Sequence, residues 1–352
     1  MKNFFYPLSY YVGGIFFALC VALISIFIGR LNFVAQLHIS PLIIGICLGI
    51  LLSFVYRKAV FTASKLETGI SFSAKKILRL GIILYGFNVS LSDISNVGII
   101  GIMLSLGIVV VILCLGVFVG VKFLRLDKEL AILVSMGSAI CGAAAILAME
   151  SALQSAPHKG IIAVGTVVVF GLIGMFLYPI LYQFGFIPLN DMEEGLYIGA
   201  TLHEVANVVG AGDAISQECA SYALITKMIR VMLLAPVLLI IPWCLERFSQ
   251  GDKQTRQIAS RKKFYIPWFA LWFLLVIFSH SFIELPETLI ECAKFLSVLC
   301  LTMAMCALGL QIDFEKFIAF GGEAFKLAFI LFLTLSVGGF LVIYALSYFQ
   351  II

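Results

Sequence analysis

Two ionisable residues, His203 and Glu204, stand side by side in the apolar, glycine-rich stretch GATLHEVANVVGAG at 199–212. An ionisable side chain in a segment apolar enough to enter lipid is costly, so it generally faces a cavity or a partner. Glutamate can carry a proton or pair with a cation, and histidine titrates near neutrality or donates to an anion. Neighbours on a helix point about 100° apart, so the pair shares one ligand only where the helix is interrupted. We expect both residues to exchange protons, with a buried structural ion pair as the alternative.

A second glycine-rich stretch, GSAICGAAAIL, begins at Gly137. Glycines that interrupt a helix free backbone amides and carbonyls, which in hydrocarbon must find partners in protein, water or a ligand. A half-helix that begins after Ser138 would direct unpaired N–H groups and the positive end of its dipole at an anion. The candidate binding residues here are Gly137, Ser138, Cys141, Gly142 and Ala143. The alternative is close helix packing by small residues, to which we assign the GxxxG spacings GICLG at 45 and GVFVG at 116.

Cations come from a third stretch, ALITKMIRVMLLAP, in which Lys227 and Arg230 are three residues apart and so share one helix face. Arginine suits oxyanions because its planar guanidinium donates two hydrogen bonds to neighbouring oxygens. We expect both cations to attract an anion or to neutralise Glu204 or Glu150. The alternative is that they snorkel to a membrane surface. The remaining candidates are Thr201 and Asn207 for binding and Glu150 for coupling.

An enzymatic interpretation rests on the run HEVAN at 203, which begins like the zinc-binding motif HExxH. Asn207 stands where the second histidine would be, and an amide oxygen is a poor zinc ligand. The nine cysteines lie mostly inside apolar runs without CxxC pairs, so we interpret them as packing residues. We therefore expect no metal, no cofactor and no enzymatic activity.

Membrane-spanning helices must carry these residues. Of the 352 residues, 62% are apolar and 12% are charged, whereas a soluble domain is about half apolar and about a quarter charged. Apolar runs of spanning length recur along the whole chain, which predicts an all-α, multi-pass membrane protein with about eleven transmembrane helices. We place the spans near 11–29, 40–56, 78–92, 97–121, 130–150, 160–184, 195–212, 222–245, 264–283, 292–312 and 324–347.

The distribution of cations predicts the orientation. With the N-terminus in the cytoplasm, the inner segments hold most lysines and arginines, and the outer segments hold only Arg30, Lys159 and Lys294. This asymmetry follows the positive-inside rule. The first apolar run is too long for a cleavable signal peptide and has no small-residue cleavage site after it, so we interpret it as the first span.

We expect a single membrane domain over 1–352 with two notable cytoplasmic segments. Residues 57–79 mix apolar and cationic side chains, as a helix in the membrane interface does, although an ordinary charged connector fits equally well. Residues 246–263 are polar and basic, which is typical of a linker. An echo between YGFNVSLSDI at 85 and CALGLQIDF at 306 indicates an inverted repeat, because their ends face opposite sides. The two glycine-rich stretches also resemble each other, but the predicted topology runs them in the same direction.

Four segments in order, GISFSAKKILRLGIILYGFNVSLSDI, GSAICGAAAI, GATLHEVANVVGAG and TKMIRVMLLAPVLL, resemble the YeiH-type family of bacterial inner-membrane proteins, which are predicted sulfate exporters. Asn207 and Gly210 depart from the Gln and Ala often found there, and the histidine–glutamate pair is intact. The resemblance implies an inverted-repeat secondary transporter fold with crossed discontinuous helices. It also implies a panel domain and a core domain that move by alternating access.

The residues and the resemblance together predict a membrane transport domain for a small inorganic or organic anion, sulfate-like or sulfite-like, with export favoured by the resemblance. The coupling ion is a proton, with sodium left open. A passive anion channel and a membrane sensor without flux are the alternatives. The expected partners are the anion and the lipid bilayer, not nucleic acid, and a homodimer is left open.

Overall fold

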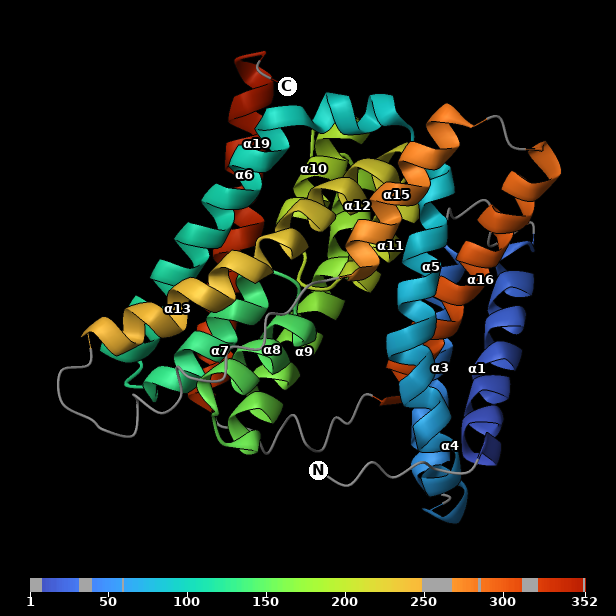
Figure 1. Ribbon diagram of the computed structural model, residues 1–352, viewed down its shortest axis with the longest axis horizontal. Helices are drawn as coiled ribbons and strands as arrows, with labels where there is room; N and C mark the ends of the chain where they lie inside the picture. The colour runs from blue at the N-terminus through green and yellow to red at the C-terminus, as the bar shows by residue number, and fades with distance from the viewer. Residues whose placement is uncertain are drawn as a thin grey trace. The chain divides into compact units, whose positions relative to one another are not determined.

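The computed structural model describes residues 8–31, 40–58, 60–248, 268–283, 286–311, 322–350 and 352. Within these ranges nearly every residue is helical and there is no strand (Figure 1), so the expected all-α class is confirmed. The chain divides into two compact units. Unit 1 comprises Met1–Ser92 and Phe269–Phe314, and unit 2 comprises Asp93–Trp268 and Glu315–Ile352.

Unit 1 is a bundle of apolar helices. Its elements are α1 (Leu8–Gly29), α3 (Pro41–Lys58), α4 (Val60–Phe72), α5 (Leu78–Tyr85), α15 (Trp268–Phe282) and α16 (Glu287–Gln311). The π-helical turn Ser73–Ile77 joins α4 to α5 without interruption, and the 3-10 turn Gly86–Asn88 ends this run. α16 packs against α3 and α5, and α1 packs against α3 and α4.

Glycines allow these helices to approach closely. A Cβ on Gly49 would overlap with the carbonyl oxygen of Cys306 on α16, and a Cβ on Gly69 would lie 2.7 Å from the Cα of Gly14 on α1. In unit 2 a Cβ on Gly116 would overlap with the side chain of Ser135. The assignment of both GxxxG spacings to helix packing is therefore confirmed.

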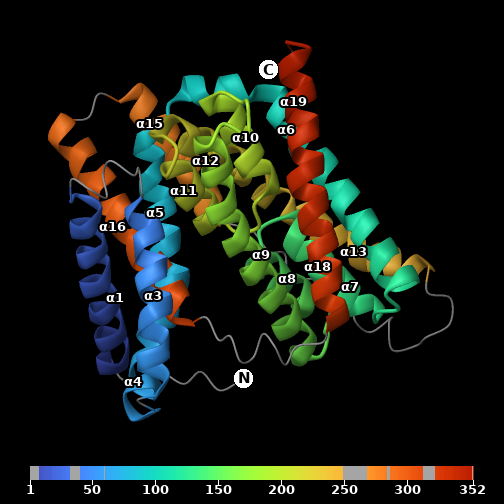
Figure 2. The ribbon, with the colours of Figure 1, turned by 180° about the vertical axis from the view of Figure 1, so that it is seen from behind.

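Unit 2 contains every candidate site residue. Its longer elements are α6 (Leu91–Phe118), α9 (Pro157–Gln183), α12 (Gln217–Met232), α13 (Leu234–Phe248), α18 (Gly322–Leu333) and α19 (Gly339–Tyr348). α6 changes direction at Gly98, whose φ of 41° a glycine adopts freely. The π-helical turn Thr334–Gly338 joins α18 and α19 into one rod, which Figure 2 shows from behind.

The first glycine-rich stretch, expected as a single span at 130–150, folds as two short helices. These are α7 (Lys128–Ala139) and α8 (Ala143–Leu153), which pack against each other on either side of a break at 140–142. Lys159 at the start of α9 forms ion pairs with Asp127 at 2.6 Å and Glu129 at 2.8 Å, both at the start of α7. α8 therefore returns to the end from which α7 began, and α7–α8 is a re-entrant hairpin (Figure 1).

Asp127 fixes the start of this hairpin. It caps α7 by accepting a hydrogen bond from the backbone N–H of Leu130 at 3.3 Å. Partial burial acts to raise the pKa of Asp127, but the hydrogen bonds from Lys159 and from the Leu130 backbone outweigh it and hold the pKa below its ordinary value. The pair places Lys159 at the same end of unit 2 as the cations Arg125 and Lys128, not at the opposite end as the sequence predicted.

The second glycine-rich stretch, expected as a span at 195–212, is a hairpin at the other end of α9. Its helices are α10 (Asp191–Thr201) and α11 (Val205–Asp213). Tyr182 near the end of α9 donates to Asp191 at 2.6 Å, and Gln183 donates to the carbonyl of Ala214 at 3.4 Å. Both ends of α10–α11 therefore lie where α9 ends, whereas both ends of α7–α8 lie where α9 begins.

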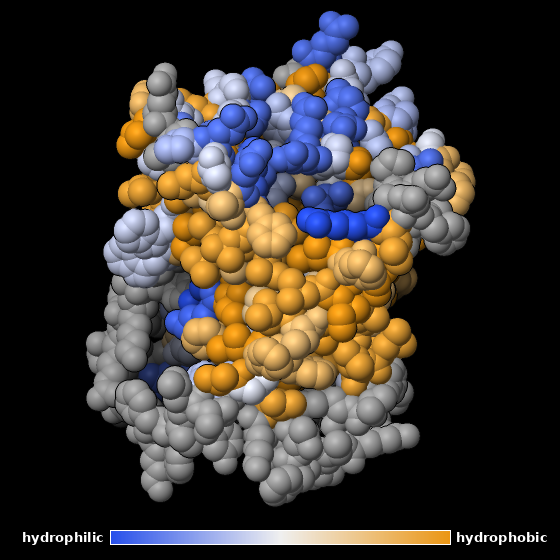
Figure 3. Space-filling model, turned by 90° about the vertical axis from the view of Figure 1, so that its right-hand side faces the viewer, coloured by the Kyte–Doolittle hydropathy of each residue, from blue (hydrophilic) through white to orange (hydrophobic). Residues whose placement is uncertain are grey.

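Six helices in the described ranges are long and apolar enough to cross a membrane, namely Tyr11–Gly29, Leu91–Phe123, His158–Gln183, Gln217–Trp243, Glu287–Gln311 and Gly322–Tyr348. The expected count of eleven is not confirmed. At a rise of about 1.5 Å per residue, none of the four hairpin helices spans a hydrocarbon core of about 30 Å. On the face in Figure 3, hydrophobic residues cover the middle and hydrophilic residues gather at the upper end. The chain is a multi-pass membrane protein.

Of the two cytoplasmic segments expected from the sequence, the structure describes most of the first and only the beginning of the second. Residues 60–79 belong to α4, the π-helical turn and the start of α5, and Phe72 contacts Tyr11 of α1 edge-on at 5.9 Å between ring centroids. The linker expected at 246–263 lies beyond the described residues from 249 onward. The eight cysteines with described side chains are free thiols; six are buried or half-buried, as packing residues are, whereas Cys114 and Cys292 are exposed.

The close approach of α3 to α16 predicts the effect of a larger residue at Gly49. Gly49→Leu should lower the free energy of unfolding by about 1–3 kcal/mol, the usual cost of overpacking, because its side chain would overlap with the backbone of α16. Gly107→Leu is the matched control, since a Cβ there meets open space. Thermal unfolding in detergent measures both, and equal melting temperatures for the two variants would contradict the prediction.

Candidate functional site

Arg230 of α12 joins the tips of the two hairpins. Its side chain is wholly buried, and all three guanidinium nitrogens donate to backbone carbonyls. The carbonyl acceptors are Ser138 at 3.0 Å and Ala139 at 2.6 Å on the first hairpin, and Gly199 at 3.2 Å, Ala200 at 2.6 Å and Leu202 at 3.3 Å on the second. The last carbonyls of a helix have no partner within it, so Arg230 satisfies the ends of α7 and α10 together.

Lys227, one turn earlier on α12, bridges the same tips. Its Nζ donates to the carbonyl oxygen of Ile140 at 2.7 Å and to that of Leu202 at 2.5 Å. These are the first residues of the two breaks. The side chain of Lys227 is wholly buried as well, so the alternative that the two cations snorkel to a membrane surface is wrong.

The crossing of the tips carries an excess of positive charge. α7 and α10 end there, and α8 and α11 begin there. The helix dipoles place a partial charge of about −0.5 at each carboxyl end and about +0.5 at each amino end, so these four partial charges cancel. Lys227 and Arg230 contribute two positive charges, and the only carboxylate that hydrogen-bonds at the tips within the described residues is Glu204. With Lys227, Arg230 and Glu204 all ionised and His203 neutral, about one positive charge would remain at the crossing. An anion would compensate it.

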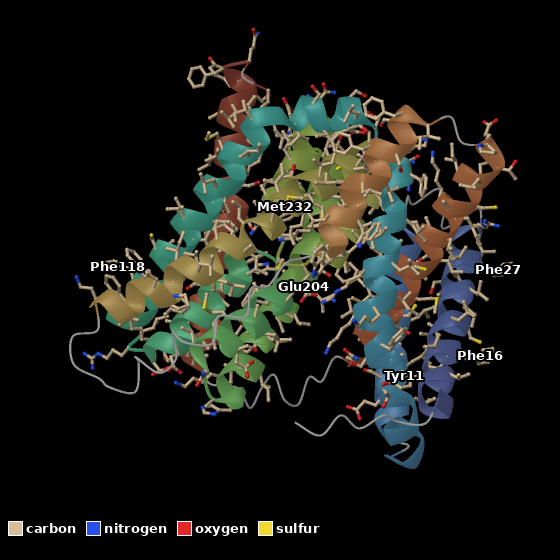
Figure 4. All side chains as sticks on the ribbon, viewed as in Figure 1. Tyr11, Phe16, Phe27, Phe118, Glu204 and Met232 are labelled. Atoms are coloured by element: carbon tan, nitrogen blue, oxygen red, sulfur yellow. The ribbon has the colours of Figure 1, made fainter. Side chains whose placement is uncertain are left out.

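Glu204 reaches from the second tip to the first hairpin. Its Oε1 accepts a hydrogen bond from the backbone N–H of Ala143, the first residue of α8, at 3.3 Å. A carboxylate in this position is stabilised by the positive end of the helix. Gly142 permits the approach, because its φ is 71° and a Cβ there would lie 2.5 Å from the Glu204 Cγ. Figure 4 shows Glu204 near the middle of unit 2.

The start of α8 is the accessible part of the crossing. Ala143, Ala144 and Glu204 are half-buried, whereas Cys141 and Gly142 beside them are buried. In the first turn of α8 the N–H of Ala143 donates to Glu204, whereas the N–H groups of Ala145 and Ile146 donate to the carbonyl of Gly142 at 3.1 and 3.2 Å. An anion that reached the crossing could therefore take the place of the Glu204 carboxylate on the N–H of Ala143.

His203 lies in the second break, next to the two cations. Its ring is wholly buried, and neither ring nitrogen has a hydrogen-bond partner in the part of the chain that the structure describes. The ring stacks on Phe332 of α18 with the centroids 6.3 Å apart. Lys227 and Arg230 lie within electrostatic reach of it. An imidazolium would add a third positive charge here, so the geometry fits a neutral ring with one N–H to donate.

Most candidate residues of the first stretch lie at the tip. Ser138 gives its carbonyl to Arg230, and its buried hydroxyl has no partner among the described residues. The side chain of Cys141 is buried in the break, and Gly142 and Ala143 contact Glu204. Gly137 instead allows close packing within the hairpin and against α9, since a Cβ there would lie 2.6 Å from Ile146 of α8 and from Val167 of α9.

Thr201 and Asn207 are close to the second break in sequence but face other helices. The Thr201 hydroxyl donates to the carbonyl of Tyr197 at 2.7 Å, and its methyl group faces Gly339 of α19. The Asn207 side-chain amide lies over Gly171 of α9, where a Cβ would come 2.5 Å from its Nδ2. Both residues therefore pack the second hairpin against neighbouring helices.

Glu150 lies well away from the crossing. Seven residues separate it from Ala143 along α8, which corresponds to about 10 Å of helix. Its carboxylate lies against Gly160 in the first turn of α9, where a Cβ would overlap with it. The structure therefore does not bring Glu150 together with His203 and Glu204, although the sequence placed all three in one coupling group.

Sequence reasoning missed a buried polar cluster at the other end of α10. Glu194 is wholly buried, and the hydroxyls of Tyr178 and Tyr197 both reach Ser336. The predicted span began at residue 195 and so left Glu194 outside the membrane. The spacing of Glu194, Tyr197 and Thr201 at i, i+3 and i+7 was the available signal, because it puts all three on one stripe of a helix.

The fold and the site define a multi-pass helical membrane protein with two discontinuous helices whose breaks meet at buried cations. A family model described as Conserved hypothetical protein 698 matches residues 13–328. The chain belongs to this family, the UPF0324 membrane proteins, which is also the family of the YeiH-type proteins that its motifs resemble.

Relatives from several bacteria cover almost the whole chain. A UPF0324 membrane protein of Helicobacter hepaticus is 46% identical over 350 residues, which cover 96% of this chain and 99% of the relative. One of Bacteroides thetaiotaomicron is 43% identical over 334 residues, with 94% and 98% covered, and one of Campylobacter jejuni is 41% identical over 346 residues, with 93% and 92% covered. No solved structure matches the chain. The family name carries no activity, so function must be argued from the site.

Loss of the Arg230 guanidinium should destabilise the crossing. Arg230→Met removes the donors for buried carbonyls on both hairpins, and an unsatisfied buried acceptor costs about 1–3 kcal/mol. We expect the variant to lose more than about 3 kcal/mol of unfolding free energy and to expose the breaks to protease.

Lys326→Met is the control for Arg230→Met, since it removes an exposed cation of unit 2 that pairs with Glu323. Such an exposed pair contributes about 0–1 kcal/mol. Thermal unfolding and limited proteolysis compare the two variants, and a wild-type melting temperature for Arg230→Met would refute the structural role of the guanidinium.

Proposed function

We propose that the protein is a secondary active transporter of a small anion, sulfate-like or sulfite-like, and that the anion binds where the two hairpin tips meet. The observation that carries this proposal is the charge of the crossing. Lys227 and Arg230 are wholly buried there, and Glu204 already occupies the amino end of α8 as an internal anion. Two broken helices that meet at a charged centre are a recurrent way for transporters to bind ions.

The cations act through the backbone in this proposal. The N–H groups of Arg230 and Lys227 already donate to backbone carbonyls. The two side chains therefore contribute charge and rigidity to the site, and not direct hydrogen bonds to the anion. The direct donor at the start of α8 is the N–H of Ala143, which Glu204 now occupies. Backbone amides at a helix start bind anions without needing a specific side chain.

Glu204 couples the anion to a proton. Its carboxylate and the anion compete for the same N–H at Ala143, and both carry negative charge. Protonation of Glu204 releases this N–H and removes the repulsion, so proton and anion bind together. His203, next in the chain and without a hydrogen-bond partner in the described ranges, can accept a hydrogen bond from the protonated carboxyl of Glu204 or donate one to the anion.

The arrangement of the hairpins supports an inverted repeat and alternating access. α7–α8 begins where α9 begins, and α10–α11 begins where α9 ends. The stretches GSAICGAAAIL and GATLHEVANVV therefore run in opposite directions, as the corresponding parts of an inverted repeat would. Unit 2 holds every site residue and unit 1 holds none, as a core domain and a panel domain would.

The orientation that we propose keeps the N-terminus in the cytoplasm of a bacterium. Because Lys159 pairs with Asp127, it joins the cations on the inner side, and Arg30 and Lys294 are left as the outer ones. The positive-inside asymmetry is then stronger than the sequence alone indicated. Export and location in the inner membrane follow the resemblance to the YeiH-type family.

Flux of radiolabelled sulfate or sulfite into liposomes tests the function. We expect wild-type protein to show saturable uptake, counterflow and a rate that changes with pH. Glu204→Gln should still bind the anion. The change of its flux rate with pH should be at least about tenfold smaller than in the wild type, because the amide side chain has no acidic proton to exchange.

Glu218→Gln, which removes an exposed acid of α12, is the control and should keep the wild-type pH profile. Flux without saturation or counterflow would favour a passive channel over a carrier. No flux of any small oxyanion above that of empty liposomes would refute the proposal.

A further inference from the structure

Glu194 is a buried acid that no contact explains. It lies in the first turn of α10 and is 0% exposed, and neither carboxylate oxygen has a hydrogen-bond partner in the described part of the chain. Its neighbour Glu193 differs, since it completes a capping box with Asn190 at 2.8 and 2.9 Å. A buried carboxyl without a hydrogen bond is expensive to keep, which points to a role other than stability.

A stripe of hydroxyl groups runs from Glu194 to the break in the second hairpin. Tyr197 and Thr201 follow at i+3 and i+7 on α10, and Tyr178 of α9 stacks on Tyr197 with the ring centroids 4.7 Å apart. The Tyr178 hydroxyl lies 2.8 Å from the Ser336 Oγ. From Glu194 to Thr201 the stripe covers about 10 Å and ends one residue before the break.

The π-helical turn between α18 and α19 completes this stripe. The Tyr197 hydroxyl donates to the backbone carbonyl of Ser336 at 2.9 Å, and Ser336 lies in the π-helical turn Thr334–Gly338. Such turns leave backbone groups free for other partners and are frequent at functional sites. The hydroxyls of Tyr178 and Tyr197 are thus held in place beside Glu194 by a third helix.

Among the residues that the structure describes, none of the groups around Glu194 is a compensating cation. Besides Lys227 and Arg230, the titratable residues near Glu194 on α10 and on the helices that pack around it are Asp191, Glu193, Tyr197, Tyr178, Tyr182, Asp213, Glu218, Cys219, Tyr222, Tyr344 and Tyr348. Asp191 already accepts from Tyr182. The two cations of α12, Lys227 and Arg230, bind carbonyls at the far end of α10. An ionised Glu194 would therefore be buried without an opposite charge, so its neutral, protonated form fits the structure.

We propose that Glu194 is a proton-binding site, which takes a proton from water at the exposed end of the hairpin α10–α11 and holds it in the buried state. The step needs no other reactant: a hydronium ion transfers its proton to the carboxylate oxygen and becomes water, and the reverse transfer returns the proton to water. Asn190, one turn away, is exposed, so the path to water is short. The inference that this proton serves anion transport rests on the function proposed above.

Infrared spectroscopy of the purified protein in detergent tests the site without any substrate. At neutral pH the wild type should show the carbonyl stretch of a protonated carboxyl, which shifts in heavy water. Glu194→Gln, which matches the shape of the protonated acid, should lose this band, and Glu218→Gln should keep it. An unchanged band in Glu194→Gln, or no such band in the wild type, would overturn the proposal.

A second variant and a transport assay complete the test. Tyr197→Phe keeps the acid and removes a hydroxyl that donates to Ser336 and not to Glu194, so the band should remain; its loss would contradict the assignment to Glu194. In liposomes, Glu194→Gln should keep saturable anion flux and show a smaller proton dependence than the wild type, with the part that Glu204 carries retained. Absence of anion flux in every protein, with the infrared result as expected, would refute the transport function and leave the proton site standing.

Discussion

The fold of unit 2 depends on the hydrogen bonds that Arg230 and Lys227 make to backbone carbonyls. Two helices end in the interior of an apolar unit, and their last carbonyl groups have neither water nor a following helical turn to bind. A guanidinium with three donating nitrogens and an ammonium next to it satisfy both ends at once. Without these cations the tips would leave unpaired carbonyl acceptors in an apolar core. Because each cation binds carbonyls of both hairpins, α12 and the two hairpins stabilise one another.

The same contacts set the chemistry of the crossing. Because the carbonyl ends are neutralised by full positive charges, the amino ends of α8 and α11 keep their attraction for anions. Glu204 uses one of them, at Ala143. Gly142 is required for that contact, and the half-buried start of α8 is where the crossing can be reached. One arrangement thus explains the buried cations, the acidic residue in the break and the glycine opposite it.

The sequence predicted the residues of the site better than their roles. The glycine breaks, the His203–Glu204 pair and the shared face of Lys227 and Arg230 could be recognised, because an apolar background makes charge and glycine conspicuous. The partners of the cations could not, since backbone carbonyls have no residue signature. The re-entrant course of both stretches was also hidden, because hydropathy measures the length of an apolar run and not where the chain turns back.

Glu194 was missed for a related reason. Hydropathy places the start of a span only to within a few residues, and the predicted start at residue 195 left the acid at 194 outside the membrane.

The most direct measurement is the reactivity of a single cysteine at the start of α8. Ala144→Cys in a cysteine-free background places a thiol at a half-buried position beside the amide that Glu204 caps. The account predicts that a negatively charged thiol reagent of the methanethiosulfonate type reacts faster than a positively charged one of similar size, and that sulfate or sulfite slows the reaction. Equal rates for the two reagents, with no protection by either anion, would contradict an anion site at the crossing of the hairpins.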